Sequence, residues 1–236
     1  MTTARKQDWP SVKFGDVVEN INLVERNPLD AGLDRFVGLE HMDSENLHIR
    51  RWGMIEGSDT TFTKRFRKGQ VLFGKRRAYQ RKVAVAEFDG ICSSDILTFD
   101  PKGDALIPEL LPFIVQSEGF FAHALGTSAG SLSPRTRWSQ LADYEFPLPP
   151  KDEQRRIAEI LWAADDGITA LSEAESNAAA LGVSLFEEEM HQGRQAQGQS
   201  SVVLAIGDVL KGIIAGKSPA CSSQPAGPEE YGVGPD

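Results

Sequence analysis

The residues of this sequence with the clearest chemistry form a run of cationic side chains. Between Thr60 and Ala86 there is no aspartate or glutamate, but there are five arginines and four lysines. Four aromatic residues are interleaved with them, namely Phe62, Phe66, Phe73 and Tyr79. Guanidinium groups bind phosphates through paired N–H donors, and aromatic rings stack on bases. A run of charge is often only a solvated face, but this mixture favours a nucleic-acid contact.

The charge of the rest of the chain makes this run more informative. The net charge is −9, with 25 basic and 34 acidic residues, and nine of the basic residues lie in the run. An acidic surface repels DNA unless positive charge is concentrated in one place. The run therefore predicts that one segment, rather than the whole surface, meets the nucleic acid.

A second polar segment, residues 126–138, contains glycines and hydroxyl side chains and ends in Arg135 and Arg137. Loops of this composition are binding elements about as often as plain connectors. The pairing of hydroxyl groups and backbone amides with two arginines favours binding.

No set of catalytic residues accompanies these candidates. The sequence has neither a Gly-x-Gly-x-x-Gly nor a Gly-x4-Gly-Lys-Ser/Thr motif, so neither a nucleotide-binding fold nor an ATP-driven motor is indicated. The histidines show no metal-ligand spacing, and Cys92 and Cys221 are too few for a disulfide framework or a cysteine-built zinc site. Asn27–Asp30 is interpreted as a turn. We therefore expect no catalytic residue, metal or cofactor; the alternative, a methyltransferase or nuclease fragment, would need one of the missing motifs.

The candidate residues must be positioned by a domain of mixed secondary structure. Short apolar runs bounded by Gly, Asp or Pro predict strands at residues 36–39, 70–73, 82–86 and 95–99. Residues 110–116 and 120–125 have the pattern of helices. These elements predict an α+β fold for residues 1–150, with the basic run on strands and their connections.

A proline hinge follows this domain. Pro147, Pro149 and Pro150 fix the backbone and withhold N–H donors, so the strand-like run before them must end. Asp152 and Glu153 then stand where a helix N-terminus favours negative charge. We expect a long helix over residues 151–192.

Apolar residues on this helix recur at alternating steps of four and three, which is the pattern of a coiled coil. They are Ile157, Leu161, Ala164, Ile168, Leu171, Ala178, Leu181 and Leu185, with one pause at the three-residue step from Leu171 to Ala174. Such a step overwinds a coiled coil without ending it. An amphipathic helix packed on its own domain is the alternative.

The remaining residues, 193–236, give two expectations. Ile206–Leu210, with the sequence IGDVL, repeats Phe14–Val18, with the sequence FGDVV, and therefore suggests a linker and the start of a second domain. From Gly216 onward Gly, Pro and Ser dominate, so this part is expected to be poorly ordered. No apolar run approaches the ~20 residues of a membrane span and the start lacks a signal-peptide core, so we expect a cytoplasmic location.

Three segments resemble the specificity subunit of type I restriction–modification enzymes. They are FVGLEHMD at Phe36–Asp43, the run Phe66–Phe99 and FPLPPKDEQRRIAEIL at Phe146–Leu161. The resemblance implies a target recognition domain that reads one half of a bipartite site in double-stranded DNA, and a conserved helix that spaces it from a second such domain. It also implies a subunit without catalysis of its own, whose partners are a modification subunit and a restriction subunit.

The resemblance assigns roles to the candidate residues. The expected DNA-binding residues are Lys64, Arg65, Arg67, Lys75, Arg76, Arg77, Tyr79, Arg81, Lys82, Arg135 and Arg137. Within this set, Lys75, Arg76, Arg77, Tyr79 and Arg81 are expected to form the contact strip, flanked by Arg135 and Arg137. The apolar helix residues are the expected interface with a partner helix.

The chain departs from the family pattern in having one recognition domain and only the opening of a second. Two alternatives stay open. The chain is a half-subunit that pairs with a second copy through the long helix, or it is a truncated remnant that serves at most as a scaffold for the modification subunit.

Overall fold

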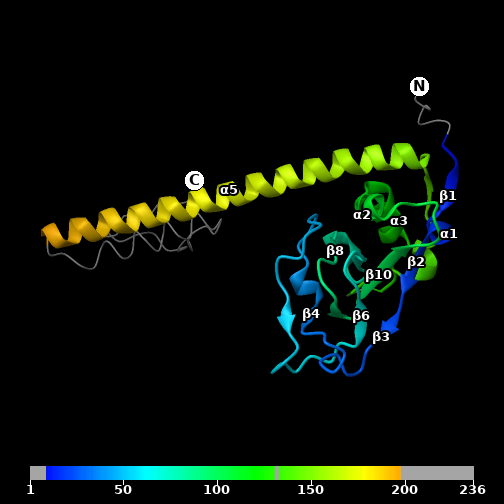
Figure 1. Ribbon diagram of the computed structural model, residues 1–236, viewed down its shortest axis with the longest axis horizontal. Coiled ribbons are helices and arrows are strands. Elements are labelled where there is room, and N and C mark those ends of the chain that lie inside the picture. The colour runs from blue at the N-terminus through cyan, green and yellow to red at the C-terminus, as the bar shows by residue number, and fades with distance from the viewer. Residues whose placement is uncertain (1–8, 131–132, 198–236) are drawn as a thin grey trace, which may run out of the picture. The chain divides into compact units, whose positions relative to one another are not determined.

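The computed structural model describes residues 9–130 and 133–197 (Figure 1). The chain divides into two compact units, with the boundary between Ala163 and Ala164. All the described strands belong to the first unit. The expected second-domain start at Ile206–Leu210 lies outside the described residues.

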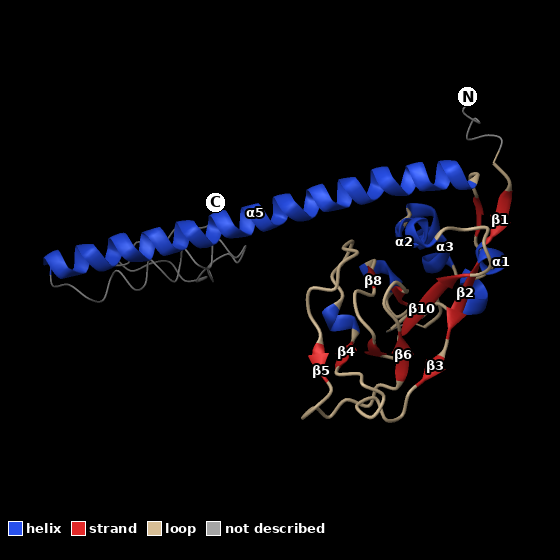
Figure 2. Cartoon of the chain, in the orientation of Figure 1, coloured by secondary structure: helices blue, strands red, loops and turns tan. Residues whose placement is uncertain are grey.

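Three β-sheets build the first unit (Figure 2). The four-stranded sheet is antiparallel throughout and has the order β2 (Val18–Ile21), β10 (Ile96–Pro101), β7 (Val71–Gly74) and β8 (Val83–Val85). The five-stranded sheet has the order β3 (Leu23–Val24), β6 (Lys64–Phe66), β9 (Gly90–Cys92), β4 (Arg35–Val37) and β5 (Gly53–Met54), and in it only β4 and β9 are parallel. A two-stranded sheet pairs β1 (Ser11–Lys13) with β11 (Glu145–Pro147), so the beginning and the end of the domain meet.

Short helices connect these strands. The α-helices of the domain are α1 (Phe14–Val17), α2 (Leu111–Gln116), α3 (Glu118–Gly126) and α4 (Trp138–Leu141). The 3₁₀ turns are η2 (Leu39–His41), η3 (Ala78–Gln80) and η4 (Pro108–Leu110). The mixture of sheets and helices confirms the predicted α+β class. The strands expected at 70–73, 82–86 and 95–99 correspond to β7, β8 and β10, while the one expected at 36–39 is β4 followed by η2.

Aromatic rings form the centre of the larger core. The ring of Phe14 lies 4.9 Å from that of Phe120 and 5.4 Å from that of Phe99, and Phe73 lies 5.6 Å from Phe120, all as centroid distances. These rings are fully buried and come from α1, β7, β10 and α3. The core therefore fixes β7, whose end carries the basic residues, against α3 and the N-terminal segment.

A smaller core lies between the two larger sheets and contains Phe66, Leu72, Cys92 and Ile96. Burial raises the pKa of the Cys92 thiol to about 12, so the thiol stays protonated and poorly nucleophilic. Cys92 therefore serves as a small apolar side chain of this core.

The last helix, α5 (Lys151–Gln197), begins against its own domain. Gln154 is only 1% exposed, and its side chain accepts a hydrogen bond from the Ile107 N–H (3.0 Å) and donates to the carbonyl oxygens of Ala105 (2.9 Å) and Pro149 (2.8 Å). The Trp162 indole N–H donates to the Glu109 carbonyl oxygen at 2.9 Å. The first turns of the helix therefore pack on the domain, as the alternative interpretation of the helix expected.

The second unit contains the rest of α5 in the described residues. Residues 164–197 would extend about 50 Å at ~1.5 Å per residue. Several of its apolar side chains are exposed, with Leu171 73% and Leu181 60% accessible, whereas Val183 and Phe186 are half-buried. Among the described helices, none combines the length and the apolar character that a membrane crossing requires.

Lys64 was expected on the DNA-binding surface, but the fold buries it. It lies on β6 opposite Cys92 of β9, is only 8% exposed, and donates through Nζ to the Ile96 carbonyl oxygen at 2.9 Å. Burial lowers the pKa of Lys64 to about 8 because the charged form is poorly solvated. The expectation that Lys64 contacts DNA is thereby corrected: its ammonium group points into the domain.

This burial predicts a stability that depends on pH. The pKa of Lys64 is about 8 in the folded chain and 10.5 at its ordinary value, so between these pH values the unfolded chain holds a proton that the folded chain lacks. The contribution of Lys64 to the free energy of unfolding therefore rises from about pH 8 to pH 10.5 and is lost as the pH falls through 8. Relative to Lys64→Met, the wild type should gain up to about 3 kcal/mol across this window in urea unfolding.

The matched control is Lys68→Met, at an exposed lysine of the same basic run. Its difference from the wild type should stay constant over the same pH range. A constant difference for Lys64→Met as well would show that Lys64 is not desolvated in the folded chain.

Candidate nucleic-acid interface

The basic residues of the contact strip lie in the connection between two antiparallel strands. β7 ends at Gly74, the chain continues through Lys75, Arg76 and Arg77 into η3, and it returns through Arg81 and Lys82 to β8. The strand pairing fixes both ends of this connection. The connection therefore gathers these basic residues at one end of the four-stranded sheet.

The loop that ends in Arg135 and Arg137 lies beside this connection. The Arg77 N–H donates to the Pro134 carbonyl oxygen at 2.8 Å, and the Thr136 N–H donates to the Lys75 carbonyl oxygen at 3.1 Å. Arg76 and Arg135 form an isolated antiparallel β-bridge. The two segments that the sequence analysis singled out separately thus form one surface, which we call the basic surface; it comprises Lys75–Arg77, Tyr79 and the residues Ser133–Arg137.

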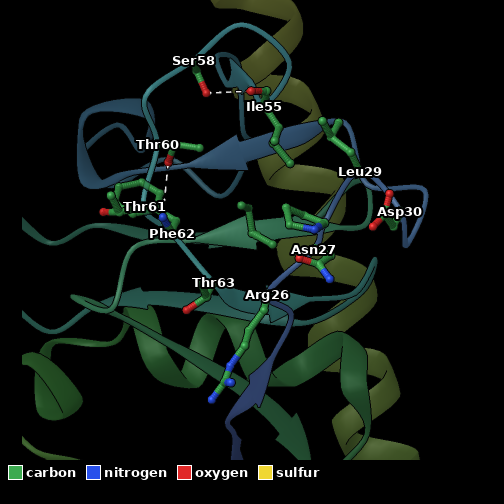
Figure 3. Close-up of a pocket in the computed structure, with 12 residues that line it drawn as sticks. Arg26, Asn27, Leu29, Asp30, Ile55, Ser58, Thr60, Thr61, Phe62 and Thr63 are labelled. Atoms are coloured by element: carbon green, nitrogen blue, oxygen red, sulfur yellow. Dashed lines mark hydrogen bonds between the residues drawn. The ribbon is translucent and has the colours of Figure 1, made fainter.

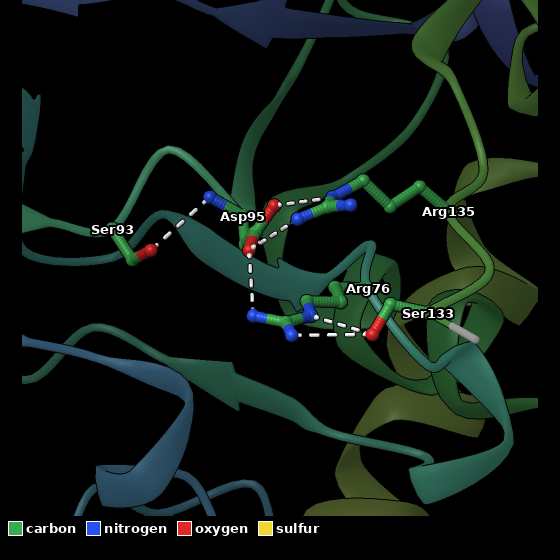
Figure 4. A network of polar contacts seen from close by, with 5 residues as sticks. All are labelled: Arg76, Ser93, Asp95, Ser133 and Arg135. Carbon is green, nitrogen blue, oxygen red and sulfur yellow. Dashed lines mark hydrogen bonds and ion pairs between the residues drawn. The ribbon is translucent and has the colours of Figure 1, made fainter. Parts of the chain in front are cut away.

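One carboxylate organises the arginines of this surface (Figure 4). Asp95 Oδ1 accepts from Arg135 Nε at 2.8 Å, and Asp95 Oδ2 lies 3.3 Å from an Arg135 terminal nitrogen and 3.6 Å from one of Arg76. Arg76 also donates to the Ser133 hydroxyl, at 3.1 and 3.4 Å. The hydrogen bond from Arg135 is the largest cause that lowers the pKa of Asp95, so the carboxylate stays ionised at neutral pH. Arg76 and Arg135 are therefore held in place before any ligand arrives.

Other cations of the expected set brace the fold. Arg81 lies 2.9 Å from a carboxylate oxygen of Glu45 and 2.7 Å from one of Glu118, and its guanidinium stacks 4.7 Å from the centre of the Phe121 ring. Lys82 donates to the Leu39 carbonyl oxygen at 2.6 Å. Arg65 lies 3.8 Å from a carboxylate oxygen of Asp89. With these contacts made, these side chains have fewer N–H groups to offer a ligand.

The remaining cations of the expected set are at least half-exposed and, among the described residues, are not paired with a carboxylate; we call them the displayed cations. Arg67 and Arg137 are exposed, and Lys75 and Arg77 are half-exposed. Within the described part of the chain, none of these four side chains forms an ion pair. They are the members of the expected set with the most free donors for phosphate.

An open cleft of about 560 Å³ lies elsewhere on the first unit (Figure 3). Its lining includes Arg26, the turn Asn27–Asp30 and the hydroxyl-rich segment Thr60–Thr63. The Ala31 N–H donates to the Asn27 carbonyl oxygen and the Leu33 N–H to that of Pro28, which confirms the interpretation of this segment as a turn. The lining combines the carboxylate of Asp30 and the guanidinium group of Arg26 with the hydroxyl groups of Ser58 and of the threonines in Thr60–Thr63.

The structure divides the expected helix interface into two parts. Ile157 and Leu161 are half-buried and pack on the core of the first unit, while Ala164, Ile168, Leu171, Ala178, Leu181 and Leu185 are exposed. Ile160, which the sequence analysis left out, is 59% exposed. The four-and-three spacing fits Ile157 and Leu161 as well as Ile160, and it does not show which face of the helix a domain already covers.

Counting from Ile160 changes the register of the apolar stripe. Steps of four and three then run without a pause through Ala164, Gly167, Leu171, Ala174, Ala178, Leu181 and Leu185. We call these eight positions the helix stripe. The three-residue break is no longer needed, and Ile168 falls beside the stripe rather than within it.

Comparison with known proteins adds a family to this geometry. A family model described as the type I restriction modification DNA specificity domain matches residues 6–180. The type I restriction enzyme EcoDI specificity subunit of Escherichia coli is 27% identical over 163 residues, which cover 67% of this chain and 36% of that protein.

Solved structures share the fold. The HsdS subunit from Thermoanaerobacter tengcongensis aligns with a TM-score of 0.57 and 22% identity over 78% of this chain and 49% of that one. The S subunit of a type I restriction–modification system from M. genitalium aligns with a TM-score of 0.52 and 14% identity, over 84% and 48%. The chain spans about half the length of these structures and about a third of the curated relative.

Proposed function

The chain belongs to the type I restriction–modification DNA specificity family, and we propose that its first unit recognises one half of a bipartite site in double-stranded DNA. The observation that carries the proposal is the basic surface, where Lys75–Arg77 and Ser133–Arg137 lie side by side. In an acidic chain, this is where a phosphate backbone can approach two cationic segments at once.

The contacts of the basic surface suggest a division of labour. The displayed cations Lys75, Arg77 and Arg137 suit phosphates, which fix the register of a protein on DNA but carry no sequence information. Arg67 precedes β7 and lies outside the basic surface. Arg76 and Arg135 are held by Asp95, and arginines fixed in this way suit contacts with base edges in the major groove. In this proposal the subunit positions the DNA and performs no chemistry.

The partners follow from the same proposal. Methyl transfer and cleavage belong to a modification subunit and a restriction subunit that the chain directs to the site. Residues 1–150 form the recognition domain, residues 151–192 space it from another recognition domain, and residues 193–236 lead into that second domain. A scaffold that binds the modification subunit without DNA specificity is the rival, and the basic surface argues against it.

Neutralising the displayed cations tests the DNA contact. Lys75→Gln combined with Arg77→Gln should weaken duplex binding and make the slope of log affinity against log salt shallower by about 2, since each phosphate contact contributes about 0.9. Fluorescence anisotropy at several salt concentrations measures both quantities. Arg156→Gln, at an exposed arginine of α5, is the matched control and should change neither. Equal affinity and slope for the wild type and the double variant would contradict the proposed surface.

Mapping methylated bases tests sequence recognition. Cells that express this chain with its modification subunit should gain methylation at a bipartite motif that is absent without the chain. A symmetric motif indicates pairing of two copies, because a two-fold assembly reads the same half-site twice. An asymmetric motif indicates a second specificity chain, and no chain-dependent methylation supports the scaffold.

The helix stripe gives a test of association. We infer that it contacts a partner helix, so Leu171→Lys should place an unpaired charge in that contact and cost several kcal/mol of association. Sedimentation of the chain alone and with the modification subunit measures the loss. Ile168→Lys is the matched control: it is equally apolar and exposed but lies beside the stripe, so it should weaken association much less. Equal effects of the two substitutions would refute the register.

A further inference from the structure

The backbone strain of the first unit is concentrated at one turn. Among the residues that the structure describes, three non-glycine residues have left-handed φ angles: Glu45 (57°), Arg77 (54°) and Arg81 (51°). Arg77 and Arg81 flank η3 directly, and the Glu45 N–H donates to the Arg81 carbonyl oxygen at 3.1 Å. Left-handed backbone costs a residue with a Cβ on the order of 1 kcal/mol or more, so two cases at one turn, and a third in the segment hydrogen-bonded to it, require an explanation.

The turn is braced from several sides. The Ser44 hydroxyl donates to the Gln80 carbonyl oxygen at 2.5 Å, and the Arg77 N–H donates to that of Pro134 at 2.8 Å. Ala78 is buried beneath the turn. The Arg81 guanidinium is fixed by the two carboxylates and the Phe121 ring described above. The surrounding structure therefore holds Arg77 and Arg81, the two residues that flank η3, in a backbone conformation that they do not favour.

Tyr79 is the side chain that this braced turn displays. It is 55% exposed, and within the described residues its ring and hydroxyl make no contact with another ring, cation or hydrogen-bonding group. On the N-terminal side of it in the sequence, Arg77 and Lys75 are among the displayed cations. The Arg77 Nε is buried and has no hydrogen-bond partner among the described residues.

We propose that Tyr79 is an aromatic wedge that packs its ring against a base step of duplex DNA, independently of sequence, while Lys75 and Arg77 bind the neighbouring phosphates. This rests on the proposed function of the first unit. A wedge must separate stacked bases, so its support must not yield, and the strained and braced turn supplies that rigidity. A phosphate or base-edge hydrogen bond from the hydroxyl would not need such a support.

Substitutions at Tyr79 separate the ring from the hydroxyl. Tyr79→Ala should weaken binding to a duplex of arbitrary sequence about tenfold with an unchanged salt slope, because stacking carries no counterion release. Tyr79→Phe should bind like the wild type. With duplexes that carry single 2-aminopurines at successive positions, fluorescence should rise when the wild type or Tyr79→Phe binds and should not rise with Tyr79→Ala. Met54→Ala, at a similarly exposed apolar residue on β5, should leave affinity and fluorescence unchanged.

Each other outcome overturns the wedge. The ring contact would be contradicted if Tyr79→Ala bound with wild-type affinity or with a changed salt slope. It would also be contradicted if Tyr79→Phe bound as weakly as Tyr79→Ala. A bound wild type with no rise in 2-aminopurine fluorescence at any position would exclude insertion. If the wild-type chain fails to bind duplex DNA, the proposed function is overturned as well. If the wild type binds and Tyr79→Ala binds equally well, only the wedge is overturned.

Discussion

The carboxylate of Asp95 is the interaction on which the geometry of the basic surface depends. Lys75, Arg76 and Arg135 converge beside it, and cations a few ångströms apart repel each other by about 1 kcal/mol or more even in water. Asp95 offsets this repulsion through its contacts with both guanidinium groups, and its backbone carbonyl oxygen accepts from the Lys75 N–H at 2.9 Å. Because its side chain is only 17% exposed, salt screens these contacts less than contacts on an open surface.

The sequence indicated the architecture where strands are runs of apolar residues and missed it where charged residues interrupt them. β7, β8 and β10 each begin with consecutive buried residues that are mostly apolar, so their pattern was visible. β6 was missed because Lys64–Phe66 has two cations on a three-residue strand, and its buried lysine contradicts the usual alternation. β1 and β11 pair residues at opposite ends of the domain, and that pairing leaves no trace in the local sequence.

The candidate site was predictable in its location but not in its division of roles. A count of charges identifies the run from Lys64 to Lys82. It cannot show that Arg81 forms ion pairs with Glu45 and Glu118 while Lys75 forms none among the described residues. Those two carboxylates come from other elements, each more than 30 residues away from Arg81 in the chain. Asp95 was missed as a site residue because an isolated aspartate before a strand has no sequence signal. Its role depends on Arg135, which lies 40 residues further along the chain.

The helix stripe shows why α5 cannot be understood from its own sequence. Gly167 costs the helix about 1 kcal/mol relative to alanine, and alanines fill three of the other stripe positions, so the stripe has little apolar bulk to bury. Among the described residues, no neighbouring atom lies within 4 Å of the point that a Cβ on Gly167 would occupy, which leaves room for a close partner. Leu171, Leu181 and Leu185 would each contribute roughly 1.5–3 kcal/mol if a partner covered them. This order of residues would suit a partner helix that approaches closely at Gly167 and buries Leu171, Leu181 and Leu185.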